Sequence, residues 1–151
     1  MKKLTLSFSL IGLTIGLSQS LIAADKVDFG KQIYPLLKDN CLSCHAAPYV
    51  EAKSGRTKKP KGGIRFDTTE LIAKGYLNDD DEPVKSVIPG KPDKSPLYTS
   101  TALPADHDDI MPAKGDPLTK AQQGLLKQWI TEGANFGGFK APTYVNPNAK
   151  K

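Results

Sequence analysis

The sequence predicts an all-α fold in which a few short helices are joined by long loops. Apolar residues recur at helical spacing in several segments, and residues that favour helix ends flank these segments. No stretch alternates apolar and polar residues as a half-buried strand would, and no internal repeat is present. The segments 49–63 and 77–92 are rich in charged residues, glycine or proline, so we expect them to be loops.

A secretory signal peptide is predicted for residues 1–24. Two lysines precede an apolar stretch at 4–17, and small residues follow at Ala23 and Ala24. The apolar stretch is shorter than the roughly 20 residues that a membrane-spanning helix needs. We therefore expect cleavage and a periplasmic or otherwise exported protein with no stable membrane span. An uncleaved anchor is the alternative.

The first helix is expected over residues 28–40, with Asp28 as its N-cap. Pro35 lies inside this segment, where a proline costs about 3 kcal/mol, so we expect a kink or a restart there. The apolar residues at helical spacing are Phe29, Ile33, Leu36 and Leu37.

Two shorter helices are expected further along. Asp67 is a candidate N-cap for a helix over 68–74, which Gly75 would end. Ser95 precedes Pro96, and proline favours the first position of a helix. Each of these helices would span only one or two turns.

The last helix has the clearest boundaries. Thr119 followed by Gln122 is a capping-box pattern, and the helix is expected to end near Gly133. Its apolar stripe consists of Leu125, Leu126, Trp129 and Ile130. We therefore assign one domain to residues 25–141 and expect the polar tail, 142–151, to be disordered.

Residues 41–45 read Cys-Leu-Ser-Cys-His, the attachment motif of a c-type haem. Cys41 and Cys44 could each form a thioether with a haem vinyl group, and His45 could then bind the iron as proximal ligand. The His45 ring should donate its Nδ1–H to a carbonyl, for which Pro48 is a candidate. The motif predicts one covalent haem c, around which the short helices would pack.

Three other uses of these cysteines remain open. In an oxidising compartment Cys41 and Cys44 could form a disulfide. A thioredoxin-like redox pair is a second possibility, but that fold needs a strand before the motif, and none is evident. A zinc site is the third, with Cys41, Cys44, His45 and His107 as its ligands.

Met111 is the expected distal ligand of the iron. It is the one methionine that remains after removal of the signal peptide, and it lies 66 residues beyond His45, followed by Pro112. Ligation by methionine and histidine raises the reduction potential of a haem, and the proline would stiffen the loop. His107, which is flanked by aspartates, is the competing ligand, and an open sixth position is the third possibility.

The charge of the chain is uneven. The formal net charge is +5, and removal of the two lysines of the signal peptide leaves 19 basic and 16 acidic residues, or +3. We interpret both charge runs as solvated loops, with docking patches as the alternative. Neither run carries aromatic residues or a nucleic-acid-binding motif, so no nucleic acid is expected as partner. The basic run is Arg56, Lys58, Lys59 and Lys61, and the acidic run is Asp79, Asp80, Asp81 and Glu82.

A family resemblance extends over roughly residues 28–136. Beyond the C-x-x-C-H motif, the chain contains Gly-Gly-x-Arg-x-Asp at 62–67 and Pro-Gly-x-Pro-x-Lys-Ser at 89–95. Ile-Met-Pro follows at 110–112, and a helix ending in Glu-Gly-Ala closes the match. This order resembles the planctomycete-type cytochrome c domain, within the class I cytochrome c group. The polar insertion around 49–61 departs from the family pattern.

The resemblance implies a cytochrome c fold with a His/Met iron and a role in electron transfer with redox partner proteins, not in catalysis. Arg65 lies in one matching segment and could pair with a haem propionate, or simply form surface hydrogen bonds. The alternative functions are a haem-dependent peroxidase and a gas-binding or sensor haem protein. Both would need an open or labile sixth position, which Met111 argues against.

Overall fold

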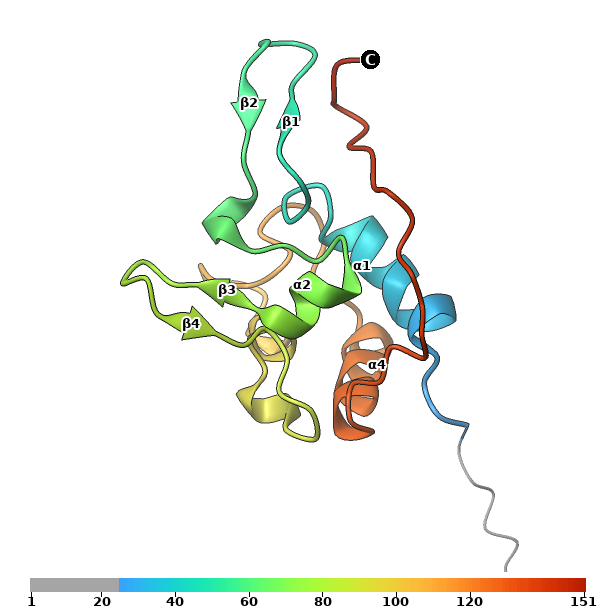
Figure 1. The fold of residues 1–151 in the computed structure, drawn as a ribbon. Coiled ribbons are helices and arrows are strands. Elements are labelled where there is room, and N and C mark those ends of the chain that lie inside the picture. Colours follow the sequence, from blue (N-terminus) through green and yellow to red (C-terminus); the bar gives the residue numbers. More distant parts are fainter. Residues whose placement is uncertain (1–24) are drawn as a thin grey trace, which may run out of the picture.

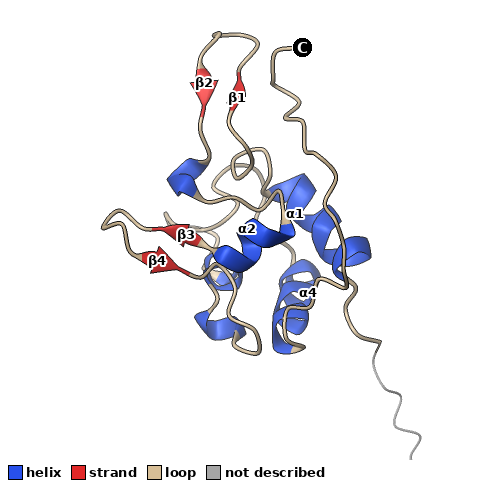
Figure 2. Cartoon of the chain, viewed as in Figure 1, coloured by secondary structure: helices blue, strands red, loops and turns tan. Residues whose placement is uncertain are grey.

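The computed structural model describes residues 25–151, so the predicted signal peptide lies outside the described residues. Short helices form the body of the domain, and two small hairpins project from it (Figures 1 and 2). Within residues 25–151, no helix has the length and apolar character needed to cross a membrane.

The prediction of an all-α fold is wrong, because the structure also contains two antiparallel sheets of two strands each. β1 (Tyr49–Val50) pairs with β2 (Thr57–Lys58), and β3 (Tyr76–Leu77) pairs with β4 (Pro83–Val84). Each strand has only two residues, which is too short to show the alternation by which a strand is recognised in a sequence.

Turn chemistry explains why these loops fold back into hairpins. In the first, Gly55 adopts a positive φ of 66°, which glycine tolerates without strain. In the second, the Asn78 side chain accepts hydrogen bonds from the backbone N–H groups of Asp80 (3.1 Å) and Glu82 (2.8 Å). Asp81 then takes a left-handed conformation with φ of 60°.

The first helix confirms both the N-cap and the break at the proline. The Asp28 carboxylate accepts a hydrogen bond from the backbone of Lys31 (2.9 Å). A π-helical turn, η1 (Phe29–Ile33), is followed by α1 (Tyr34–Asn40), which has Pro35 in its first turn. The change from π- to α-helical bonding thus falls next to Pro35, whose missing N–H cannot continue the hydrogen-bond ladder.

α2 (Thr69–Lys74) begins one residue later than predicted. Its N-cap is Thr68, whose hydroxyl accepts from the backbone of Leu71 (3.3 Å), and not Asp67. Gly75 ends the helix as expected, with φ of 86°. A side chain at Gly75 would also collide with the carbonyl oxygen of Val84, so this position requires glycine.

The two remaining helix predictions are confirmed. α3 (Pro96–Thr99) starts after Ser95, between the 3₁₀ turns η3 (Pro92–Lys94) and η4 (Ser100–Ala102). A further 3₁₀ turn, η2 (Lys61–Gly63), follows the first hairpin. α4 (Lys120–Thr131) has the capping box between Thr119 and Gln122.

The core lies between the first and last helices. The Phe29 ring packs against Trp129 at 5.2 Å and against Phe136 at 4.8 Å between centroids. Leu37, Leu126 and Ile130 are fully buried beside them. These contacts join the two ends of the domain and hold α1 in place, and the C-x-x-C-H motif follows α1 directly.

The C-terminal tail turns back along the domain after α4 and runs beside α1 towards the first hairpin (Figure 1). Tyr34 donates its hydroxyl to the carbonyl of Pro142 (3.4 Å), and Ala149 bridges to Glu51 next to β1. The segment for which the sequence predicts disorder thus has a defined path in the structure.

Candidate functional site

The C-x-x-C-H motif forms a tight turn at the end of α1. The backbone N–H of Cys41 donates to Leu37 (2.8 Å), and those of Cys44 (3.1 Å) and His45 (2.9 Å) both donate to the carbonyl of Cys41. This turn brings Cys41, Cys44 and His45 close together in the structure. Both cysteines are free thiols, with Cys41 half-buried and Cys44 exposed.

The His45 imidazole is buried and fixed in orientation. The residue is 8% exposed, its Nδ1 lies 3.3 Å from the carbonyl oxygen of Ile64, and its ring packs beside Phe66 at 5.4 Å. Because a carbonyl can only accept, Nδ1 carries the proton and Nε2 keeps a lone pair. The acceptor is the carbonyl of Ile64 and not that of Pro48, since residues 64–66 run directly beside the ring.

Burial lowers the pKa of His45, although the carbonyls of Ile64 and Lys61 partly oppose this change. The imidazole is therefore neutral at neutral pH. A neutral imidazole with one nitrogen hydrogen-bonded to the protein has the form in which histidine binds metals.

Arg65 is held by a neighbouring carboxylate. Its Nε donates to Asp67 Oδ1 (2.9 Å) and its Nη2 donates to Oδ2 (2.6 Å). Burial tends to raise the pKa of Asp67, but the bonds and charge of Arg65, with backbone N–H groups, outweigh it and lower the pKa. Oδ2 also accepts from the backbone of Ala47 (3.2 Å), so this ion pair braces the segment just after the motif.

Met111 is half-buried in the loop between η4 and α4. Its backbone N–H donates to the carbonyl of Ser100 (3.0 Å), which attaches the loop to the domain. No hydrogen bond joins the side chains of Met111 and His45 within residues 25–151. The same loop nevertheless reaches the motif, because Lys114 lines a cavity together with Cys44.

His107, the competing ligand, is exposed. Its Nδ1 accepts a hydrogen bond from the backbone of Asp109 (3.0 Å), and it lies 4.0 Å from that carboxylate. No group of three or more His, Cys, Asp or Glu side chains that could hold a metal ion occurs between residues 25 and 151. The structure therefore does not bring together the four ligands of the zinc alternative.

The environment of Cys41 disfavours a role as the nucleophile of a thiol redox pair. Burial raises the pKa of the Cys41 thiol to about 12, and a charge on Cys44 would raise it further. A redox-active nucleophile needs a lowered pKa instead. Moreover, the motif follows a helix, α1, and not the strand that a thioredoxin-like fold requires.

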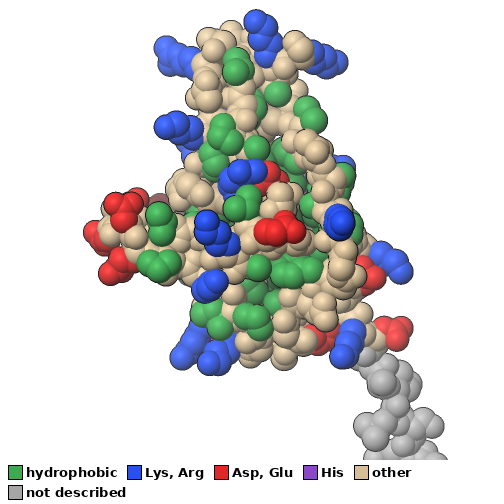
Figure 3. All heavy atoms as spheres, viewed as in Figure 1, with side chains coloured by type: hydrophobic (Ala, Val, Ile, Leu, Met, Phe, Trp, Pro, Cys, Tyr) green, Lys and Arg blue, Asp and Glu red, His purple; other side chains and the backbone are tan. Residues whose placement is uncertain are grey.

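The cavity beside Cys44 has a volume of about 700 Å³ and lies against the first hairpin. Its cationic lining residues are Lys58, Lys59, Lys61 and Lys114. Figure 3 shows basic side chains around the β1–β2 hairpin, while acidic ones gather at the turn between β3 and β4. Lys114 belongs to this group although it lies more than 50 residues from the basic run, so no sequence pattern connects it with the other three lysines.

Asn146 is a second residue that the sequence does not reveal. It is 6% exposed, and its Nδ2 donates to the carbonyl of Ser43 (3.0 Å), inside the C-x-x-C-H turn. The contact joins residues 103 positions apart, within a tail whose composition predicts disorder. Only the tertiary arrangement brings them together.

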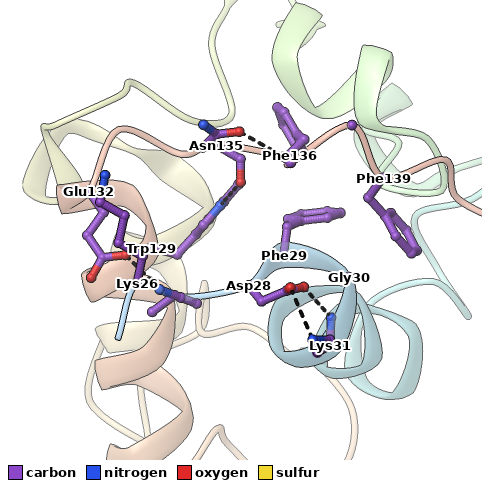
Figure 4. Close-up of a pocket in the computed structure, with 13 residues that line it drawn as sticks. Lys26, Asp28, Phe29, Gly30, Lys31, Trp129, Glu132, Asn135, Phe136 and Phe139 are labelled. Carbon is purple, nitrogen blue, oxygen red and sulfur yellow. Dashed lines mark hydrogen bonds and ion pairs between the residues drawn. The ribbon is translucent and has the colours of Figure 1, made fainter. Parts of the chain in front are cut away.

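A second hollow, of about 630 Å³, lies between η1 and α4 and contains none of the predicted site residues. Figure 4 shows Phe29 among the rings of Trp129, Phe136 and Phe139, with the Trp129 indole N–H bonded to the carbonyl of Asn135 (2.9 Å). Glu132 accepts from the backbone of Val27 (2.8 Å) at its rim. These polar groups are hydrogen-bonded to one another, so this hollow belongs to the packing between segments 26–31 and 129–139.

Comparison with models of protein families, with curated proteins and with solved structures finds no match.

Proposed function

We propose that this protein is an exported c-type cytochrome that carries one covalent haem and transfers single electrons between redox partners. The main support is the turn at 41–45, which presents two free thiols and a buried, neutral imidazole whose Nδ1–H faces a carbonyl. This donor set suits a covalent porphyrin, because it offers two sulfurs for thioethers and one nitrogen for iron. The proposal of export depends on the signal-like features of residues 1–24.

Each residue has a defined task in this proposal. Cys41 and Cys44 would hold the haem covalently, and His45 Nε2 would bind the iron. When bound, the haem supplies an iron that takes up and releases one electron. The carbonyl of Ile64 orients the His45 ring and increases its basicity, which is the usual role of such a partner.

Met111 is proposed as the distal ligand. Its thioether is a neutral donor that would close the sixth position and raise the reduction potential. The exposed position of His107 and its local hydrogen bond to Asp109 support methionine over histidine.

The test begins with protein produced together with haem-attachment machinery. Its mass should increase by one haem, and a pyridine haemochrome spectrum should show covalent haem c. Replacing both cysteines by alanine should abolish the added mass. A wild-type protein without a covalently bound macrocycle would refute the proposal.

The iron ligands are tested on the same material. Met111→Ala should remove the sulfur-to-iron charge-transfer band and lower the reduction potential, whereas the control His107→Ala should change neither. The ferrous wild-type protein should bind carbon monoxide weakly. Ready binding would favour the peroxidase or gas-sensor alternatives over an electron carrier.

A further inference from the structure

The cavity beside Cys44 is surrounded by lysines from two separate parts of the chain. We call Lys58, Lys59, Lys61 and Lys114 the basic rim. The first three belong to the β1–β2 hairpin and the turn after it, and Lys114 comes from the loop that follows Met111. All four side chains are exposed, so their charges act on solvent and on approaching molecules.

The charge of the basic rim is largely uncompensated. Glu51 is the one carboxylate among the residues that line the cavity. It pairs with Lys58 (3.4 Å) and accepts a hydrogen bond from Ser54 (2.6 Å). Within residues 25–151, the other three lysines of the rim form no ion pair. The cavity is therefore a hollow with a net positive charge.

The hairpin that carries most of the rim is held in place by the C-terminal tail. The backbone N–H of Ala52 donates to Asn148 (2.9 Å), and that of Lys150 donates to Val50 (2.8 Å). The tail thus runs beside β1 and adds the positive charges of Lys150 and Lys151 nearby. β1 is thus hydrogen-bonded to β2 on one side and to the tail on the other, which holds the hairpin that carries the rim lysines in place.

The acidic run lies elsewhere on the molecule. Asp79, Asp80, Asp81 and Glu82 are at the turn between β3 and β4, and none of them lines the cavity (Figure 3). The domain is therefore electrically asymmetric. Such asymmetry orients a charged partner during its approach and increases the rate of productive encounters.

We propose that the basic rim is the docking surface for an acidic redox partner protein, which meets this domain at the edge of the haem attached to Cys44. This inference rests on the proposed function. Cys44 is exposed and lines the same hollow as the rim, so the haem edge beside it is reachable from this side. A concave site suits a protruding acidic segment of another protein better than a flat anionic membrane.

Small redox reagents test which charge surrounds the point of electron exchange. The ferrous protein is mixed with hexacyanoferrate(III), an anion, or with tris(phenanthroline)cobalt(III), a cation, in a stopped-flow instrument. In each reaction one electron passes from the haem iron to the metal of the reagent, so the haem becomes ferric. The anion should react faster at low ionic strength and slow down as salt is added.

The key variant is Lys59→Gln/Lys61→Gln/Lys114→Gln. We expect its rate with hexacyanoferrate(III) to fall about tenfold at low salt, and its rate with the cobalt reagent to rise. The difference from wild type should disappear at about 1 M salt, where the Debye length is about 3 Å. The matched control, Asp79→Asn/Asp80→Asn/Asp81→Asn, changes the same number of charges and should stay within about twofold.

A poly-L-glutamate peptide then serves as a probe for an acidic protein segment. It should slow the wild-type reaction with hexacyanoferrate(III) and leave that of the lysine variant unchanged. Equal rates for the wild type and the lysine variant would overturn the inference. So would binding to phosphatidylserine vesicles through the rim, or salt-sensitive self-association that both variants abolish. Protein without covalent haem would refute the proposed function itself, which separates the two failures.

Discussion

Replacing Asn146 by alanine tests whether the C-terminal tail holds the C-x-x-C-H turn in place. Asn146 is buried, and its Nδ2 donates to the carbonyl of Ser43 (3.0 Å). Its Oδ1 accepts from the backbone N–H of Asn148 (3.0 Å), which shapes the end of the tail. Alanine removes both hydrogen bonds and leaves the Ser43 carbonyl without this donor.

The expected loss of stability follows from these two bonds. A typical intramolecular hydrogen bond contributes about 1 kcal/mol net, so their removal should cost about 2 kcal/mol. Ser43 is exposed, and water can hydrate its carbonyl in the variant, which limits the additional penalty. With a urea m-value of about 1–3 kcal/mol per M, the unfolding midpoint should fall by about 1 M.

The assay is urea unfolding followed by circular dichroism, on protein produced together with haem-attachment machinery. Asn148→Ala is the matched control, because the exposed Asn148 side chain makes no hydrogen bond within residues 25–151. This control should stay within about 0.5 kcal/mol of the wild type. If Asn146→Ala unfolded at the same urea concentration as Asn148→Ala, the tail would not be attached to the motif.

Three further predictions concern the support of the site. The pKa of Asp67 is lowered in the folded state, so its contribution to stability is present above its ordinary pKa of about 3.9 and is lost as the pH falls through its lower folded value. In Arg65→Gln the pKa of Asp67 should move back towards its ordinary value, because the bonds and charge of Arg65 are gone, so less stability should be lost in urea titrations between pH 7 and 3. A curve merely parallel to that of the wild type would contradict this. Gly75→Ala should lower the free energy of unfolding by about 2 kcal/mol or more in the same assay, because the position has a positive φ and a side chain there collides with Val84. An unchanged urea midpoint would show that α2 can end differently. Ser86 has a buried hydroxyl with no hydrogen-bond partner within residues 25–151, so Ser86→Ala should raise stability by up to about 1 kcal/mol in the same assay. A loss of stability would show that the hydroxyl is hydrogen-bonded in solution.

Helix boundaries could be predicted because their causes are local. The capping box of Thr119 and Gln122 joins groups three residues apart, and Pro35 breaks hydrogen bonding within its own turn. The cap of α2 was misplaced by one residue, because Asp67 and Thr68 are both good caps. Asp67 is engaged by Arg65 and Ala47, which leaves Thr68 to begin the helix.

The strands could not be predicted, because two residues are too few for a period of two to be seen. The turn residues of both hairpins were visible, but turns alone do not show that the flanking chain pairs. The β1–β2 hairpin is also supported by the tail, through bonds between residues about 100 positions apart. Such pairing depends on the folded domain and has no local pattern.

The reactive groups of the candidate site are evident from residue type and spacing: two thiols and an imidazole in five consecutive residues, and a single methionine beyond the signal-like segment. The surroundings of these groups become clear only in the folded chain. Folding places the carbonyl of Ile64 against His45, pairs Arg65 with Asp67, and brings Lys114 to the cavity beside Cys44. Reactive groups are defined by residue type and spacing, whereas their burial, hydrogen bonds and surrounding charge depend on segments that only the folded chain brings together.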